Sequence, residues 1–138
     1  MKPTLLTLAV LLLTISSCSK KDTPLRATSY IIVPQNGATI TGTVSFREIT
    51  DATQTQVDIQ LQNTAWNSKY EAHIHAGPPV YYHIAVYGFT AYAVGNTLSY
   101  QKNISMSYDS AIRYDGTFVL HDSLGNAVFG KCGIGKNG

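Results

Sequence analysis

Residues 39–46 read Thr-Ile-Thr-Gly-Thr-Val-Ser-Phe, and residues 56–62 read Gln-Val-Asp-Ile-Gln-Leu-Gln. In both stretches apolar and polar side chains alternate with a period of two, the pattern of a β-strand with one buried and one solvent-facing side. Between them, residues 50–53 are Thr, Asp, Ala and Thr, which is typical of a short connection. We therefore expect two paired strands joined by a hairpin turn.

Further segments of strand character follow along the chain and are separated by Gly, Pro and Asn. These segments are residues 71–76, 80–87, 98–105, 116–121 and 127–132, and residues 108–113 are expected to form one helical turn. No segment is long enough to supply the helix of a βαβ unit, and no internal repeat is visible. The sequence therefore predicts an all-β domain over residues 29–138, built as an antiparallel sandwich of about seven or eight strands.

The chain begins with features of an export signal. Lys2 is followed by a short apolar run over residues 5–13 and then by small polar residues, so residues 1–17 are expected to be a signal peptide. The apolar run is far shorter than the roughly 20 residues that a membrane-spanning helix needs. Residues 15–18, Ile-Ser-Ser-Cys, resemble the bacterial lipobox, which implies acylation of Cys18. The alternative is an ordinary secretory signal, with Cys18 and Cys132 joined in a disulfide.

Residues 18–28 lack periodicity and are expected to form a lipidated tether. Within it, Ser-Lys-Lys-Asp at residues 19–22 is loosely similar to the export tag of Bacteroidetes surface lipoproteins. The expected location is therefore the cell envelope, in the outer membrane of a Bacteroidetes-type bacterium. A lipid on Cys18, with acyl chains such as palmitate, makes the membrane the expected partner, and either membrane face is compatible with the sequence.

Composition narrows the class of function. Only 13% of the residues are charged and the formal net charge is +2, so no basic patch indicates a nucleic-acid partner. Two cysteines in 138 residues are too few for a disulfide-held scaffold. A hydrophobic core must therefore hold the fold together.

Four histidines lie between positions 73 and 121, and two of them form the sequence His73-Ile74-His75. On a strand, residues two apart point to the same side with Cα atoms roughly 6 to 7 Å apart, so both imidazoles can reach one ion while Ile74 enters the core. His121 ends another predicted strand, and His83 falls within the predicted strand over residues 80–87.

If the strand that ends at His121 lies beside His73 and His75, three neutral imidazoles with an open fourth position suit copper or zinc. Their nitrogens should then lie within roughly 3 to 4 Å of one another. His83 is a further candidate ligand. The alternative is that the pair at 73 and 75 forms ordinary hydrogen bonds at a sheet edge, and no carboxylate shows ligand spacing.

Residues 73–78, His-Ile-His-Ala-Gly-Pro, together with the strands at 42–46 and 57–61 before them, resemble the CHRD domain of secreted proteins. Residues 114–123 resemble the segment near that family's end, so the likeness covers residues 38–135. The resemblance implies a binding or structural module of unknown protein or glycan ligand. Tyrosines 81, 82, 87, 92 and 100 are its candidate recognition surface.

The same segments are also similar to Cu/Zn superoxide dismutase, which implies an Ig-like, Greek-key sandwich. His73, His75 and His121 match three copper ligands of that family, and residues 131–135 are similar to its C-terminal segment. The chain departs from the family in lacking the zinc loop, the partner of Cys132 and the anion-attracting arginine, whose position holds Phe129. These losses speak against dismutation, so a non-enzymatic role is the main expectation and superoxide dismutase activity is the lesser alternative.

Two functions follow as expectations. The first is an envelope lipoprotein that carries a CHRD-like binding or structural module. The alternative is a copper- or zinc-binding module for metal handling or redox protection.

Overall fold

The computed structural model describes residues 23–78 and 85–138, which form eight strands and one short helix. The elements are β1 (Ala27–Pro34), β2 (Thr41–Glu48), β3 (Thr55–Gln62), β4 (Lys69–Ala76), β5 (Ala85–Tyr92), β6 (Thr97–Ile104), α1 (Tyr108–Ala111), β7 (Asp115–His121) and β8 (Val128–Gly135). The prediction of an all-β antiparallel domain with one helical turn is confirmed. In the described part of the chain, no helix has the length and apolarity needed to cross a bilayer.

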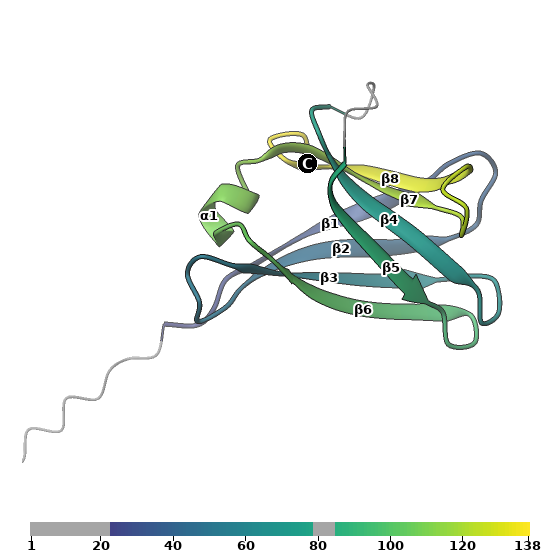
Figure 1. The fold of residues 1–138 in the computed structure, drawn as a ribbon, viewed down its shortest axis with the longest axis horizontal. Helices are drawn as coiled ribbons and strands as arrows, with labels where there is room; N and C mark the ends of the chain where they lie inside the picture. The colour runs from purple at the N-terminus through teal and green to yellow at the C-terminus, as the bar shows by residue number, and fades with distance from the viewer. Residues whose placement is uncertain (1–22, 79–84) are drawn as a thin grey trace, which may run out of the picture.

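All eight strands belong to one antiparallel sheet in the order β5-β4-β7-β8-β1-β2-β3-β6, which curls into a nearly closed barrel (Figure 1). The strand β1 joins the two halves. Its first six residues pair with β2, and Val33 and Pro34 then pair with Lys131 and Gly130 of β8. The sequence predicted a sandwich, in which two sheets pack face to face. Because β1 is shared between the halves, hydrogen bonds run without interruption from β5 to β6.

The alternation found in the sequence puts one side of each strand into the core. In the β2–β3 pair, Val44 lies opposite Ile59 and Phe46 opposite Val57, and all four side chains are buried. The predicted turn at residues 50–53 is confirmed, and the Asp51 carboxylate accepts hydrogen bonds from the backbone and side chain of Thr53. The predicted hairpin therefore supplies core side chains to one half of the barrel.

Two strand assignments differ from the prediction. The strand expected at residues 80–87 is described only from Ala85 and continues to Tyr92, because Phe89 and Ala91 continue the inward-facing pattern. Residues 80–84 lie outside the described residues. The strand β1 was not predicted as such, and it begins at Ala27, two residues before the expected domain start.

The residue before β1 is tied to the barrel. The Arg26 guanidinium forms ion pairs with Glu48 at 2.7 Å and with Asp109 at 2.8 Å, and it lies 4.6 Å from the centre of the Tyr108 ring. These contacts connect the start of the domain to β2 and α1. The expected signal peptide, Cys18 and the first part of the tether lie outside the described residues.

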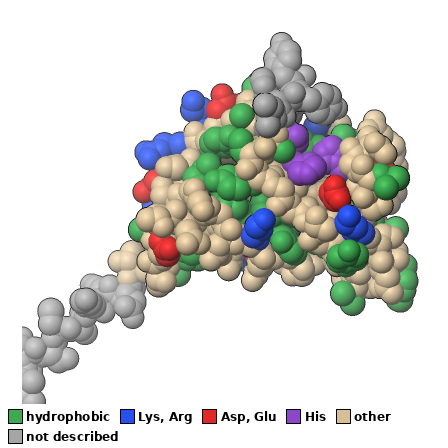
Figure 2. Space-filling model, in the orientation of Figure 1, with side chains coloured by type: hydrophobic (Ala, Val, Ile, Leu, Met, Phe, Trp, Pro, Cys, Tyr) green, Lys and Arg blue, Asp and Glu red, His purple; other side chains and the backbone are tan. Residues whose placement is uncertain are grey.

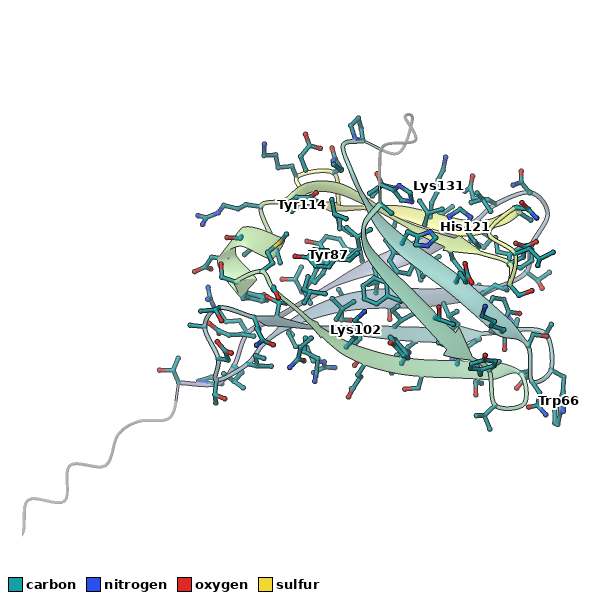
Figure 3. All side chains as sticks on the ribbon, viewed as in Figure 1. Trp66, Tyr87, Lys102, Tyr114, His121 and Lys131 are labelled. Carbon is teal, nitrogen blue, oxygen red and sulfur yellow. The ribbon has the colours of Figure 1, made fainter. Side chains whose placement is uncertain are left out.

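The barrel has a seam between its two edge strands, β5 and β6. No backbone ladder between them occurs in the described residues, and side chains bridge the gap instead. Lys102 extends from β6 and donates a hydrogen bond to the Gly88 carbonyl of β5 at 3.1 Å, and the Tyr87 hydroxyl donates to the Ser105 carbonyl at 3.2 Å (Figure 3). The rings of Phe89 and Tyr100 meet edge to face across the seam, with centres 6.3 Å apart.

Candidate metal centre

The strands β4 and β7 pair side by side and bring together histidines that are far apart in the sequence. On β4, His73 and His75 face outward, whereas Ile74 between them is 1% exposed in the core. On β7, Val119 lies opposite His73 and Thr117 opposite His75. His121 lies two residues beyond Val119 and therefore projects on the same outer side of the barrel.

The three imidazoles converge on one another. One ring nitrogen of each can be chosen so that all three lie within 4.8 Å of one another. The ring centre of His73 lies 5.7 Å from that of His75 and 5.2 Å from that of His121. Metal–nitrogen bonds of about 2.0–2.1 Å in a tetrahedral site put ligand nitrogens about 3.4 Å apart. The 4.8 Å limit is wider than this spacing, so small side-chain rotations would bring the three nitrogens to the distances that an ion requires.

His121 is the most enclosed of the three, with 8% of its surface exposed. Both its Nδ1 and its Nε2 are buried, and neither has a hydrogen-bond partner among the described residues. A neutral imidazole carries one donor and one acceptor, and leaving buried polar groups unpaired costs free energy. Such a residue at the end of a strand needs an explanation beyond packing, and a metal ion would satisfy one of its two nitrogens.

The surroundings keep the histidines in the form that binds metal. Burial lowers the pKa of His121 below its usual value, and the neighbouring His73 and His75 lower it further. Burial also lowers the pKa of His73, with a smaller contribution from His75. Both imidazoles are therefore neutral at neutral pH, so an arriving cation displaces few protons.

An acidic side chain borders the histidines. Glu71 lies directly opposite His121 in the β4–β7 register, and its negative charge raises the pKa of both His73 and His121 against the stronger lowering effects. It also accepts a hydrogen bond from the Lys69 ammonium at 2.9 Å. Figure 2 shows the described histidines as one purple patch on the barrel surface, with acidic and basic side chains beside it.

Glu71 was not among the predicted site residues, because no carboxylate shows ligand spacing in the sequence. The signal was nonetheless present, since Glu71, His73 and His75 are separated by two residues each and therefore share one side of β4.

The other predicted site residues are not brought to this centre by the described structure. His83 and Cys18 lie outside the described residues. Cys132 is a buried free thiol on β8, and burial raises its pKa to about 12. The thiol is therefore protonated and inert at neutral pH.

The tyrosines proposed as a recognition surface do not form one patch in the described residues. Tyr87 and Tyr100 are half-buried and pack against the core, whereas Tyr92 is exposed. Tyrosines 81 and 82 lie outside the described residues. Trp66, which no sequence motif indicated, is 75% exposed and lies against Gly95 at the end of the barrel (Figure 3).

Comparison with known proteins gives no family for this chain. No family model matches it. No curated protein shows a significant match to its sequence either. The arrangement of the three histidines is therefore the observation on which a function can be argued.

Proposed function

We propose that this domain is a metal-binding module in which His73, His75 and His121 hold copper or zinc and leave a fourth position open. The observation that carries the proposal is the convergence of three ring nitrogens within 4.8 Å, from two adjacent strands. Three imidazole nitrogens suit Zn²⁺ and copper, and a site with three protein ligands leaves the fourth position for water or a small ligand.

The burial of His121 supports the proposal independently of these distances. An unpartnered imidazole that is almost fully enclosed destabilises the metal-free domain, and a bound ion removes part of that cost. Strand positions also suit a preorganised site, because both β4 and β7 are hydrogen-bonded on both sides within the sheet. Small rotations of the side chains are then the main movement that binding requires.

The strand order supports the Greek-key part of the predicted superoxide dismutase-like and Ig-like sandwich, here within a single curled sheet. The strands β4, β5 and β6 follow one another around the barrel, and β7 returns to pair with β4. This return of a fourth strand beside the first is the Greek-key connection. The CHRD resemblance rests on sequence alone, and we retain it as the proposed family, with its protein or glycan ligand unassigned.

The proposed role is binding, for metal handling or redox protection, rather than turnover. At the position where the dismutase-like pattern has an arginine, Phe129 packs edge to face on Tyr70, with ring centres 6.0 Å apart. No guanidinium is therefore available there to attract an anionic substrate. We propose, from the sequence, that Cys18 is lipidated and tethers the module to the outer membrane.

Titration of the purified, metal-free protein with Zn²⁺ and Cu²⁺ tests the proposal. We expect one ion per chain in the wild-type protein and loss of that binding in the double variant His73→Ala/His121→Ala. Thr43→Ala, on the other half of the barrel, is the matched control and should bind like wild type. His83→Ala shows whether the fourth histidine contributes. Unchanged stoichiometry and affinity in the double variant would refute the site.

A further inference from the structure

Every second residue of β4 faces the outer side, and these residues are all polar. They are Lys69, Glu71, His73 and His75. Across the ladder, Glu71 is the direct partner of His121, and side chains that face each other in this way have Cβ atoms about 4.5–5.5 Å apart. Glu71 therefore borders His73 along its own strand and His121 across the strands. It lies outside the group of three whose ligand atoms converge, so it is a neighbour of the candidate ion rather than a ligand.

The charges around the three histidines are few. The imidazoles are neutral when they bind metal, so the ligand set itself brings no charge. Asp122 follows His121 and its negative charge acts on that ring, although the backbone N–H groups of Leu124 and Asn126 hold its Oδ1 in the turn after β7. Lys131 lies across β7 from His73, two strands away, because both residues pair with Val119. Among the described carboxylates, Glu71 is the one whose charge acts on both His73 and His121, and its side chain is 27% exposed.

We propose that Glu71 is a specificity-determining residue that makes the three-histidine site prefer divalent over monovalent ions. Its partner Lys69 moderates that preference. The inference rests on the proposed function, because it requires that the histidines hold the ion. The physical reason is that the Coulomb energy between Glu71 and a bound cation is proportional to the charge of the cation. If the carboxylate strengthens binding of Cu⁺ by a given factor, it strengthens binding of Zn²⁺ or Cu²⁺ by the square of that factor.

Lys69 gives this inference a control with the opposite sign. Its ammonium lies 2.9 Å from the Glu71 carboxylate and cancels part of the negative charge that the ion would experience. Removing Lys69 should therefore strengthen divalent binding, whereas removing Glu71 should weaken it. A purely structural role of the ion pair predicts the same direction for both variants, because either substitution breaks the same contact.

The experiment compares the metal affinities of wild-type protein, Glu71→Gln and Lys69→Gln, using Zn²⁺ directly and Cu⁺ in competition with a chelator. For a partly exposed carboxylate, we expect Glu71→Gln to weaken Zn²⁺ binding about tenfold and Cu⁺ binding about threefold. Lys69→Gln should tighten Zn²⁺ binding. The copper reduction potential of Glu71→Gln should rise by about 30 mV, which is the threefold change in relative affinity at 59 mV per tenfold.

Different results would disprove the histidine site and the effect of Glu71 on it. If His73→Ala/His121→Ala abolishes binding but Glu71→Gln and Lys69→Gln shift the Zn²⁺ affinity in the same direction, or not at all, this inference is wrong and the site stands. Equal changes for Zn²⁺ and Cu⁺ also overturn it. If the double histidine variant binds like wild type, the site and this inference fall together. Lys69→Gln keeps the test decisive even if Glu71→Gln folds poorly.

Discussion

Replacing His121 with leucine should stabilise the metal-free protein and destabilise the metal-loaded protein relative to wild type. The ring has two buried nitrogens without hydrogen-bond partners in the part of the chain that the structure describes, and each unsatisfied buried group costs about 1–3 kcal/mol. Leucine is close to histidine in volume and needs no hydrogen-bond partner, so it can occupy the same enclosed position, of which 8% is exposed. We therefore expect a gain in the free energy of unfolding of about 2 kcal/mol without metal.

The gain can be converted into a melting temperature. For a domain of this size, 1 kcal/mol corresponds to about 4 °C, so His121→Leu should melt about 8 °C above wild type in the presence of a chelator. At a free metal concentration 1,000 times the dissociation constant, wild type gains about 4.1 kcal/mol and the variant gains far less. The order of the two melting temperatures should therefore reverse.

Urea and thermal unfolding, followed by circular dichroism first in chelator and then in excess Zn²⁺, measure the stability difference between His121→Leu and wild type in both conditions. His121→Leu being less stable than wild type in chelator would show that the ring is satisfied in solution, and the reasoning from its burial would fail. His121→Leu melting above wild type in chelator and below wild type in excess Zn²⁺ is the outcome that supports it.

Three further predictions concern the fold and its charges. Phe118→Ala should lower the free energy of unfolding by about 3–5 kcal/mol in urea, because the ring is fully buried, whereas Ile31→Ala at an exposed position should change it by less than about 0.5 kcal/mol. Cys132 should react with a thiol reagent only after unfolding, since burial raises its pKa to about 12, and rapid labelling of native protein would contradict this. Hydrogen bonds from Arg26 lower the pKa of Glu48 to about 2, so carboxyl NMR should show a return toward 4.5 in Arg26→Gln. The stability from this pair should be complete above pH 4.5 and lost as the pH falls toward 2.

The sequence was sufficient to predict local relations but not long-range pairing. The period of two at His73, Ile74 and His75 placed both imidazoles on one side and the isoleucine in the core, and the structure confirms this arrangement. The proximity of His121 could only be stated as a condition, because it depends on β7 pairing with β4. The pairing of β1 with β8 could not be predicted from the sequence either, since only two residue pairs, one of them Val33 with Lys131, join the halves of the barrel.

Other differences have local physical causes. The run of apolar and aromatic residues at 80–87 favoured a strand, but such a run does not show where the strand ends. The strand β5 continues to Tyr92 because Phe89 finds a place in the core. Likewise, the role of Glu71 depends on which residue of β7 lies opposite it, and register between distant strands is set by the whole barrel rather than by the segment itself.

The seam between β5 and β6 has a consequence for how these molecules behave when they are crowded. Each edge strand offers backbone N–H and C=O groups that no ladder uses in the described structure, and exposed edges of this kind template the association of separate chains. Lys102 lies across that gap, with its ammonium on the Gly88 carbonyl and over the Phe89 ring. A second chain that added a strand there would have to displace this contact and bury a charge. Together with the Tyr87–Ser105 hydrogen bond and the Phe89–Tyr100 contact, Lys102 therefore makes these edges less available to a neighbouring molecule.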